Sequence, residues 1–261
     1  NIIWNVRNTY LKGNGAVNYI FRRLCGFLSY IIPKKVIYVS YSAQREHLKS
    51  GFNKSNSIVI GNGFDIDKYS YSHQYRTKYR SMFNISSDDI AVFSVGRFVP
   101  AKDHKTFIQT ICRARDKNPK IKGVLIGRDI SLDIFELTSE QKKGFVVLGE
   151  RNDISKILSA ADIFCLHSIT EGFSNVLGEA MSVGLPCVAT RAGDAELILS
   201  SNKYVVDVMD YTSLANLIVD LSFSNCMNQL GMANRNNIIE NYSLDKIQNT
   251  YNTLYKKVYN E

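Results

Sequence analysis

Short apolar runs recur along most of the chain, and segments with a helical spacing of apolar residues separate them. The runs are rich in Val, Ile and Phe, and they end near Gly, Ser or Thr. Strands buried on both faces of a parallel sheet have this pattern. We therefore expect strands at 2–6, 35–40, 57–60, 90–95, 122–126, 145–148, 163–167 and 186–190.

The segments between these runs indicate helices. Apolar residues at helical spacing predict them at 103–115, 153–161, 175–182, 211–222 and 244–259. Alternating strands and helices are typical of doubly wound α/β sheets. The polar, tyrosine-rich stretch 65–89 has no strong period and marks a boundary between two sheets. We predict a partial Rossmann-like domain at 1–65, onto which helix 244–261 packs back, and a second at 66–243.

Segment 16–32 has its apolar residues on one helical face, and basic residues flank it. The favoured interpretation is a helix that packs on the first sheet. The alternative is a helix that touches a membrane interface. The apolar positions are Val17, Ile20, Phe21, Leu24, Phe27, Leu28 and Ile31, and the flanking bases are Arg22, Arg23, Lys34 and Lys35.

Composition narrows the class of protein. The chain has 261 residues, 45% of them hydrophobic, which is enough for two modest cores. The five cysteines are scattered without a C-x-x-C pair, so the sequence predicts neither a disulfide framework nor a zinc site and favours a reducing cytoplasm. No signal peptide and no apolar stretch of spanning length is found. Because the sequence starts with Asn1 rather than Met and runs directly into the strand expected at 2–6, we expect preceding sequence.

The positive charge is concentrated near the start. Residues 1–54 hold nine basic residues and one acidic residue, Glu46, and this difference equals the net charge of +8. Such a face suits an anionic lipid surface or a lipid diphosphate, although a merely solvated basic surface is the plain alternative. Nucleic acid is the least favoured partner, since no nucleic-acid-binding motif accompanies the charge.

Two carboxylates, Glu171 and Glu179, flank an expected helix start. With the helix opening near Asn175 and Ser174 as its N-cap, the N–H groups of 174–176 favour a phosphate. Gly172 lets the backbone approach that ligand. One acid would then bind a sugar and the other a ribose. The spacing of the two glutamates could also arise by chance. They could alternatively be the acid and nucleophile of a glycoside hydrolase, but the phosphate-binding helix start argues against a hydrolase.

Cations follow the strand expected at 90–95. Arg97 comes directly after Gly96, and Lys102 follows five residues later, so both are positioned to meet one phosphate edge. Gly127 and Arg128 follow the next strand and form either a base- or phosphate-side turn or an ordinary turn. An exposed basic loop is the alternative for Lys102.

These residues together resemble glycosyltransferase family 4, whose members are retaining enzymes of the GT-B fold. The resemblance runs from about residue 58 to the final helix and depends on the order and spacing of several motifs. They are Gly96-Arg97-Phe98 to Lys102, 125–127, 147–149, 161–163, Glu171-Gly172-Phe173-Ser174-Asn175-Val176-Leu177-Gly178-Glu179 and 184–190.

The resemblance implies a role for each matching residue. Arg97 and Lys102 would bind and stabilise the departing diphosphate, Glu171 would contact the transferred sugar, and Glu179 would hold the ribose. Backbone groups of Phe173, Ser174, Asn175 and Val176 would line the donor, together with Gly96, Gly127, Arg128 and Gly172. No metal and no cofactor is implied, and the D-x-D sequence 65–67 is interpreted as a connector.

The implied substrates are a UDP- or GDP-sugar and a glycan or polyprenyl-linked acceptor, in bacterial surface polysaccharide or lipopolysaccharide assembly. The implied location is cytoplasmic, with peripheral attachment to the inner face of the plasma membrane as the alternative to a free protein.

The chain departs from the family at its start. Family members have a Gly-rich loop there, which this chain lacks, and often a histidine at the position that Arg7 occupies here. Arg7 is therefore the acceptor-side candidate. Asp194 also stands where a small residue is usual. A donor-binding module without catalysis, or a basic membrane or polyanion adaptor, therefore stays open. The four histidines, His47, His73, His104 and His167, are interpreted as structural or surface groups.

Overall fold

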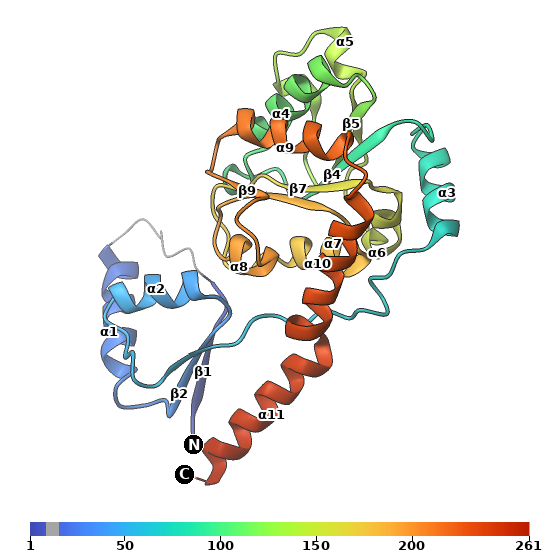
Figure 1. Cartoon of the computed structure of the whole chain (residues 1–261). Helices are drawn as coiled ribbons and strands as arrows, with labels where there is room; N and C mark the ends of the chain where they lie inside the picture. The colour runs from blue at the N-terminus through green and yellow to red at the C-terminus, as the bar shows by residue number, and fades with distance from the viewer. Residues whose placement is uncertain (9–15, 261) are drawn as a thin grey trace.

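A computed structural model describes residues 1–8 and 16–260, and these form two parallel β-sheets at the two ends of the molecule (Figure 1). The first sheet has the order β1-β2-β3 and contains β1 (Ile3–Val6), β2 (Lys35–Tyr38) and β3 (Ser57–Val59). Helices α1 (Ala16–Leu28) and α2 (Tyr41–Lys49) connect these strands. We call this part, together with helix α11 (Leu244–Asn260), which packs on it, the first lobe.

The second lobe is built on a six-stranded sheet of order β6-β5-β4-β7-β8-β9. The strands are β4 (Ile90–Val95), β5 (Ile121–Ile126), β6 (Phe145–Val147), β7 (Ile163–Leu166), β8 (Cys187–Thr190) and β9 (Val205–Val206). All neighbouring pairs are parallel. The chain moves outward from β4 in one direction and resumes beside it with β7, so the order reverses between β4 and β7. Ligands of open α/β sheets bind at such a switch point.

Helices cover both faces of the second sheet. The helices of this lobe are α3 (His73–Met82), α4 (His104–Lys117), α5 (Ser139–Lys142), α6 (Ile154–Ile157), α7 (Asn175–Val183), α8 (Ala195–Leu199), α9 (Tyr211–Ser222) and α10 (Met227–Tyr242). One core cluster joins the sheet to α3, α6 and α7, and the other joins it to α4 and α9. The predicted α/β fold with two parallel sheets is confirmed.

The chain crosses between the lobes twice, and the two crossings touch. The Phe64 N–H donates to the Tyr242 carbonyl at 2.8 Å, and the Leu244 N–H donates to the Phe64 carbonyl at 2.9 Å. Helix α11 (Leu244–Asn260) then returns to the first sheet, where Leu254 and Val258 pack with Ile37 and Ile60. The division at residues 65 and 66 stays a prediction.

The structure differs from the sequence expectation at several helices. Residues 153–161 form a short α6 followed by a 3-10 turn at Leu158–Ala160. Helices α2, α3 and α10 were not expected, because their sequences are polar. Helix α1 forms as expected, but its apolar face does not pack on the first sheet, since Val17, Ile20, Phe21, Leu24 and Phe27 are 48–64% exposed. The favoured interpretation of this face was therefore wrong.

Candidate functional site

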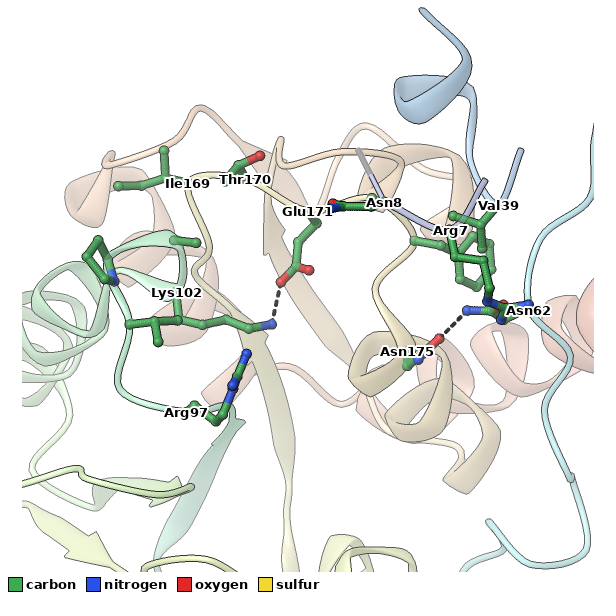
Figure 2. A pocket seen from close by; sticks show the side chains of 15 residues that line it. Arg7, Asn8, Val39, Asn62, Arg97, Lys102, Ile169, Thr170, Glu171 and Asn175 are labelled. Atoms are coloured by element: carbon green, nitrogen blue, oxygen red, sulfur yellow. Dashed lines mark hydrogen bonds and ion pairs between the residues drawn. The ribbon is translucent and has the colours of Figure 1, made fainter. Parts of the chain in front are cut away.

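A cavity of about 850 Å³ opens between the two lobes at the switch point. The loop after β4 contributes Arg97 and Lys102, and the loop after β7 contributes Glu171 to Asn175. These loops lie together because β4 pairs with β7, with Val92 opposite Ile163. The first lobe contributes Arg7 at the end of β1. The lining residues are Arg7, Asn8, Val39, Asn62, Arg97, Val99, Pro100, Ala101, Lys102, Ile169, Thr170, Glu171, Gly172, Phe173 and Asn175 (Figure 2).

An ion pair joins the two loops inside this cavity. Lys102 Nζ lies 2.5 Å from Glu171 Oε1, and the Ser168 hydroxyl donates to the same oxygen at 2.7 Å. The two charged side chains are 23% and 13% exposed, so water screens them only partly. A 3-10 turn at Pro100–Lys102 directs Lys102 inward, and the Ile169 N–H donates to the Ala101 carbonyl at 2.9 Å. Glu171 is therefore held facing the cavity.

Arg97 adds a second cation beside Lys102. Figure 2 shows its guanidinium directed toward the end of the Lys102 side chain. Among the described residues, Arg97 has no carboxylate partner. Two neighbouring cations with a single carboxylate, that of Glu171 paired with Lys102, leave a local excess of positive charge, which a bound anion would relieve.

Helix α7 begins at Asn175, as predicted, and Ser174 occupies its N-cap position. The Ser174 hydroxyl makes no capping bond, however, and it is buried without a hydrogen-bond partner among the described residues. The prediction that Ser174 caps the helix is therefore right in position and wrong in the bond. The first N–H groups of α7 keep their capacity to bind an anion.

A chain of side-chain hydrogen bonds links the two walls of the cavity. Arg7 Nη2 donates to Asn62 Oδ1 at 2.6 Å, and Asn62 Nδ2 donates to Asn175 Oδ1 at 2.6 Å (Figure 2). The acceptor-side candidate Arg7 is thereby joined to the first residue of α7. Phe173, from the same loop, packs on Phe64 with ring centroids 6.0 Å apart.

Glu179 lies in an adjoining cavity of about 460 Å³, which shares Arg7, Asn62 and Asn175 with the first. Burial raises the pKa of the Glu179 carboxyl, and the Tyr69 hydroxyl, which donates to it, opposes that shift. The two glutamates therefore face separate but connected spaces. One extended ligand that occupied both cavities would contact Glu171 in the first and Glu179 in the second.

Some predicted donor residues lie outside both spaces. Among the described residues that line the two cavities, Gly96, Gly127, Arg128, Ser174 and Val176 are absent. Arg128 is exposed and pairs with Glu150 at 3.1 Å. Gly96 packs directly beneath the Lys102 side chain. Ser174 and Val176 are neighbours of the lining residues, so their backbone groups stay candidates.

The family model described as "Glycosyl transferases group 1" matches residues 89–222, which is just over half of the chain. The chain belongs to this family. The resemblance noted from the motifs is confirmed, and the matched segment contains Arg97, Lys102, Glu171 and Glu179.

Individual glycosyltransferases are similar over longer stretches. An Escherichia coli enzyme named "UDP-Gal:alpha-D-GlcNAc-diphosphoundecaprenol alpha-1,3-galactosyltransferase" is 26% identical over 74% of this chain and 53% of its own length. The capsular polysaccharide biosynthesis glycosyltransferase CapM of Staphylococcus aureus is 22% identical over 98% of this chain and 71% of its own. This chain spans about half the length of the first curated relatives that it matches.

Solved structures support the GT-B fold of this chain. HepE from Anabaena, solved in complex with UDP, superposes with a TM-score of 0.85 at 22% identity. The match covers 97% of this chain and 72% of HepE.

Two buried histidines, His104 and His167, lie against the segment that follows the loop after β4. The His167 Nδ1–H faces the Asp103 carbonyl at 3.1 Å, and Nε2 lies 2.5 Å from the Ser94 hydroxyl. Burial lowers the pKa of His167 to about 3, so the ring is neutral at physiological pH. Its ring also packs on Phe107 and on His104. This environment fits the structural role expected for His167.

The described residues contain no group of three or more His, Cys, Asp or Glu side chains that could hold a metal ion. Asp65 Oδ1 instead accepts from the N–H groups of Asp67 and Lys68, at 3.2 and 2.9 Å. Side-chain bonds of this kind stabilise a turn, which fits the interpretation of 65–67 as a connector. Metal independence stays a prediction.

The contacts of two residues of this region are not predictable from the sequence. Tyr69, which contacts Glu179, lies in the stretch without a period. Asp194 was noted only as a departure from the family, yet it is buried against the first lobe. Both make contacts with residues more than 100 positions away, so spacing along the chain carries no trace of them.

Proposed function

We propose that this chain transfers a sugar, with retention of anomeric configuration, from a nucleotide diphosphate sugar to a glycan or lipid-linked acceptor. One observation carries the proposal: Arg97, Lys102, Glu171 and the uncapped start of α7 face one cavity at the switch point of the second sheet. This arrangement provides fixed positive charge for a diphosphate and a carboxylate for sugar hydroxyls.

The proposed step needs stabilisation of a leaving group. The bond between the anomeric carbon and the diphosphate oxygen breaks, and negative charge accumulates on the diphosphate. The acceptor hydroxyl oxygen bonds to the anomeric carbon, and its proton passes to the departing diphosphate. Arg97, Lys102 and the N–H groups at the start of α7 would stabilise that charge without reorganising, which is how preorganised sites lower a barrier. Glu171 would orient the sugar, and Glu179 would bind the ribose. In this proposal no metal and no cofactor takes part.

The comparisons support a particular class of substrate. The name of the Escherichia coli relative specifies a UDP-sugar and a diphosphoundecaprenol acceptor, and a Campylobacter jejuni relative also has a diphospho-undecaprenol acceptor in its name. HepE was solved with UDP and with UDP-glucose. We infer a UDP-sugar donor, with a GDP-sugar as the alternative, and a polyprenyl-linked glycan of a bacterial surface polysaccharide or lipopolysaccharide as acceptor.

Calorimetry with UDP, GDP and ADP tests the donor site. We expect one nucleotide to bind, and Arg97→Ala and Glu179→Ala each to weaken that binding. Arg128→Ala is the matched control, because Arg128 is a nearby cation that lines neither cavity. Absence of heat with all three nucleotides, or equal losses in the control, would contradict the proposal.

Two alternatives predict different results. A donor-binding module without catalysis would bind the nucleotide but turn over no nucleotide sugar, even in a longer chain that includes upstream sequence. A basic adaptor would bind polyanions in a salt-sensitive manner that survives Arg97→Ala and Glu179→Ala.

We also propose that the exposed face of α1 rests on the anionic inner surface of the plasma membrane. Val17, Ile20, Phe21, Leu24 and Phe27 present apolar surface beside several bases. No described helix is long and apolar enough to cross a bilayer. Apolar contact together with attraction to acidic lipids would hold the protein at the interface.

Liposome flotation tests this membrane proposal. We expect recovery with vesicles that contain phosphatidylglycerol and little recovery with phosphatidylcholine alone. Phe21→Asp should abolish the recovery with anionic vesicles, while Phe223→Asp, at an equally exposed phenylalanine of the second lobe, should preserve it. Equal recovery with neutral and anionic vesicles would contradict the proposed attraction between the basic residues and acidic lipids.

A further inference from the structure

Two adjacent chain segments join the two lobes covalently, and elsewhere the lobes face each other across the cavity. Residues 61–64 and 242–244 run side by side between the lobes, and Phe64 is hydrogen-bonded to Tyr242 and Leu244. Two adjacent crossings of this kind form a natural hinge. The separation of the lobes therefore also depends on contacts between the lobes outside these two crossings.

Asp194 of the second lobe makes such a contact with helix α2 of the first lobe. Its carboxylate accepts from the Tyr41 N–H at 2.6 Å and from the Ser42 N–H at 2.9 Å. These are the first residues of α2, whose orphan N–H groups and positive dipole end favour a carboxylate. The hydroxyl of Ser40, the N-cap of α2, accepts from the Ala43 N–H at 3.0 Å. The first lobe thus obtains two of its helix-capping bonds from the second.

The same residue holds the loop that carries Glu171. The Asp194 N–H donates to the Gly172 carbonyl at 3.1 Å. Gly193 has φ of +60°, and a Cβ there would lie 2.5 Å from the carbonyl oxygens of Glu171 and Gly172. Only glycine permits this approach. Asp194 is therefore bonded through its backbone to the site loop and through its side chain to the opposite lobe.

We propose that Asp194 is a positioning residue that couples closure of the two lobes to the placement of the Glu171 loop. Asp194 is 4% exposed, so the two charge-assisted bonds of its carboxylate form away from competing water. A cavity of about 200 Å³ beside it, lined by Tyr41, Asp194 and Tyr242, leaves room for the lobes to move. The catalytic consequence rests on the proposed function, but the mechanical coupling does not.

Distance measurements between the lobes test the coupling. Cys25 in α1 and Cys226 before α10 are exposed and lie on different lobes, so both accept nitroxide labels in a Cys112→Ser background. Double electron–electron resonance should give one narrow distance distribution for the parent protein. Asp194→Ala should add a population of longer distances, and Asp194→Asn, which keeps one acceptor oxygen, should add a smaller one.

Asp210→Ala is the matched control. Asp210 also caps a helix with its carboxylate, accepting from the Ser213 N–H at 2.9 Å, but both partners belong to the second lobe. We expect its distance distribution to equal that of the parent. An unchanged distribution in Asp194→Ala would overturn the proposal, and so would equal broadening in Asp210→Ala, because that result indicates a general loss of stability.

A binding measurement separates this proposal from the proposed function. Because Arg97, Lys102 and the start of α7 all belong to the second lobe, Asp194→Ala should keep the UDP affinity of the parent while its distances lengthen. Loss of UDP binding in parallel with longer distances would overturn the assignment of Asp194 to lobe positioning. Absence of UDP, GDP and ADP binding in the parent would contradict the donor site and leave the distance result as the test of the coupling.

Discussion

Helices α7 and α1 have the same apolar periodicity but opposite environments. Leu177 of α7 is fully buried against the second sheet, whereas Leu24 of α1 is 48% exposed. Periodicity arises from the backbone repeat of 3.6 residues and therefore predicts that a helix forms with one apolar face. It does not predict what covers that face. The function proposed for each helix follows from this difference, since α7 begins at the donor cavity and α1 presents its face to the outside.

The largest expected effect contrasts these two leucines directly. Leu177→Ala should lower the free energy of unfolding by about 2–5 kcal/mol, because a cavity remains in a packed core. Leu24→Ala should change it by less than about 0.5 kcal/mol, as expected for an exposed position. Urea denaturation of both variants measures the difference. A loss at Leu24 as large as that at Leu177 would show that the α1 face is covered in solution.

The next largest effect is on ligand binding, at the donor cavity beside α7 and at the exposed face of α1. Lys102→Ala should weaken UDP binding by about 1.5–3 kcal/mol, the range for hydrogen bonds to charged groups, and should leave vesicle flotation unchanged. Arg23→Ala, next to the α1 face, should reduce flotation with anionic vesicles and leave UDP binding unchanged. Calorimetry and flotation on both variants measure this crossed pattern. If either substitution changes both properties, the separation of the two surfaces is wrong.

A glycine substitution tests how closely α7 is packed. A Cβ at Gly178 would lie within 2.0–2.6 Å of three atoms of the Phe64 ring, at the hinge between the lobes. Gly178→Ala should therefore destabilise the protein by about 1–3 kcal/mol, the usual range for overpacking. Ser182→Ala, one turn later in the same helix, removes only a hydroxyl that donates to the Gly178 carbonyl and serves as the control. Thermal unfolding that ranks Ser182→Ala as the more damaging change would contradict this packing.

The second lobe was largely predictable because its signals are local. Buried strands are apolar runs, and the sequence predicts Arg97, Lys102 and Glu171 as site residues because they follow such runs. Helix α10 was missed because its sequence is polar. It is held by long-range bonds such as Asn234 Nδ2 to the Leu185 carbonyl at 2.8 Å. The contacts of Asp194 and Tyr69 are not predictable for the same reason, since their partners come from distant parts of the chain.

The smallest expected effect concerns the pH dependence of stability at Glu179. Burial raises the pKa of this carboxyl above its ordinary value of 4.5, so the folded protein disfavours its charged form. Stability is therefore lost as pH rises from the unfolded-state pKa through the raised folded-state pKa, and the loss is complete above it. Glu179→Gln removes that loss. It should melt at a higher temperature than the parent at pH 7, and the difference should shrink toward pH 4.

Tyr69→Phe sharpens this test, because the Tyr69 hydroxyl donates to the charged form of Glu179 and lowers its pKa. Without that hydroxyl the carboxylate is less well compensated, so the variant should lose stability at pH 7 relative to the parent and recover most of it at pH 4. In a Glu179→Gln background the pH dependence introduced by Tyr69→Phe should disappear. If this pH dependence persists in the Glu179→Gln background, Tyr69 acts through a group other than Glu179. The burial of Glu179 in α7 would then not explain why this helix differs from α1.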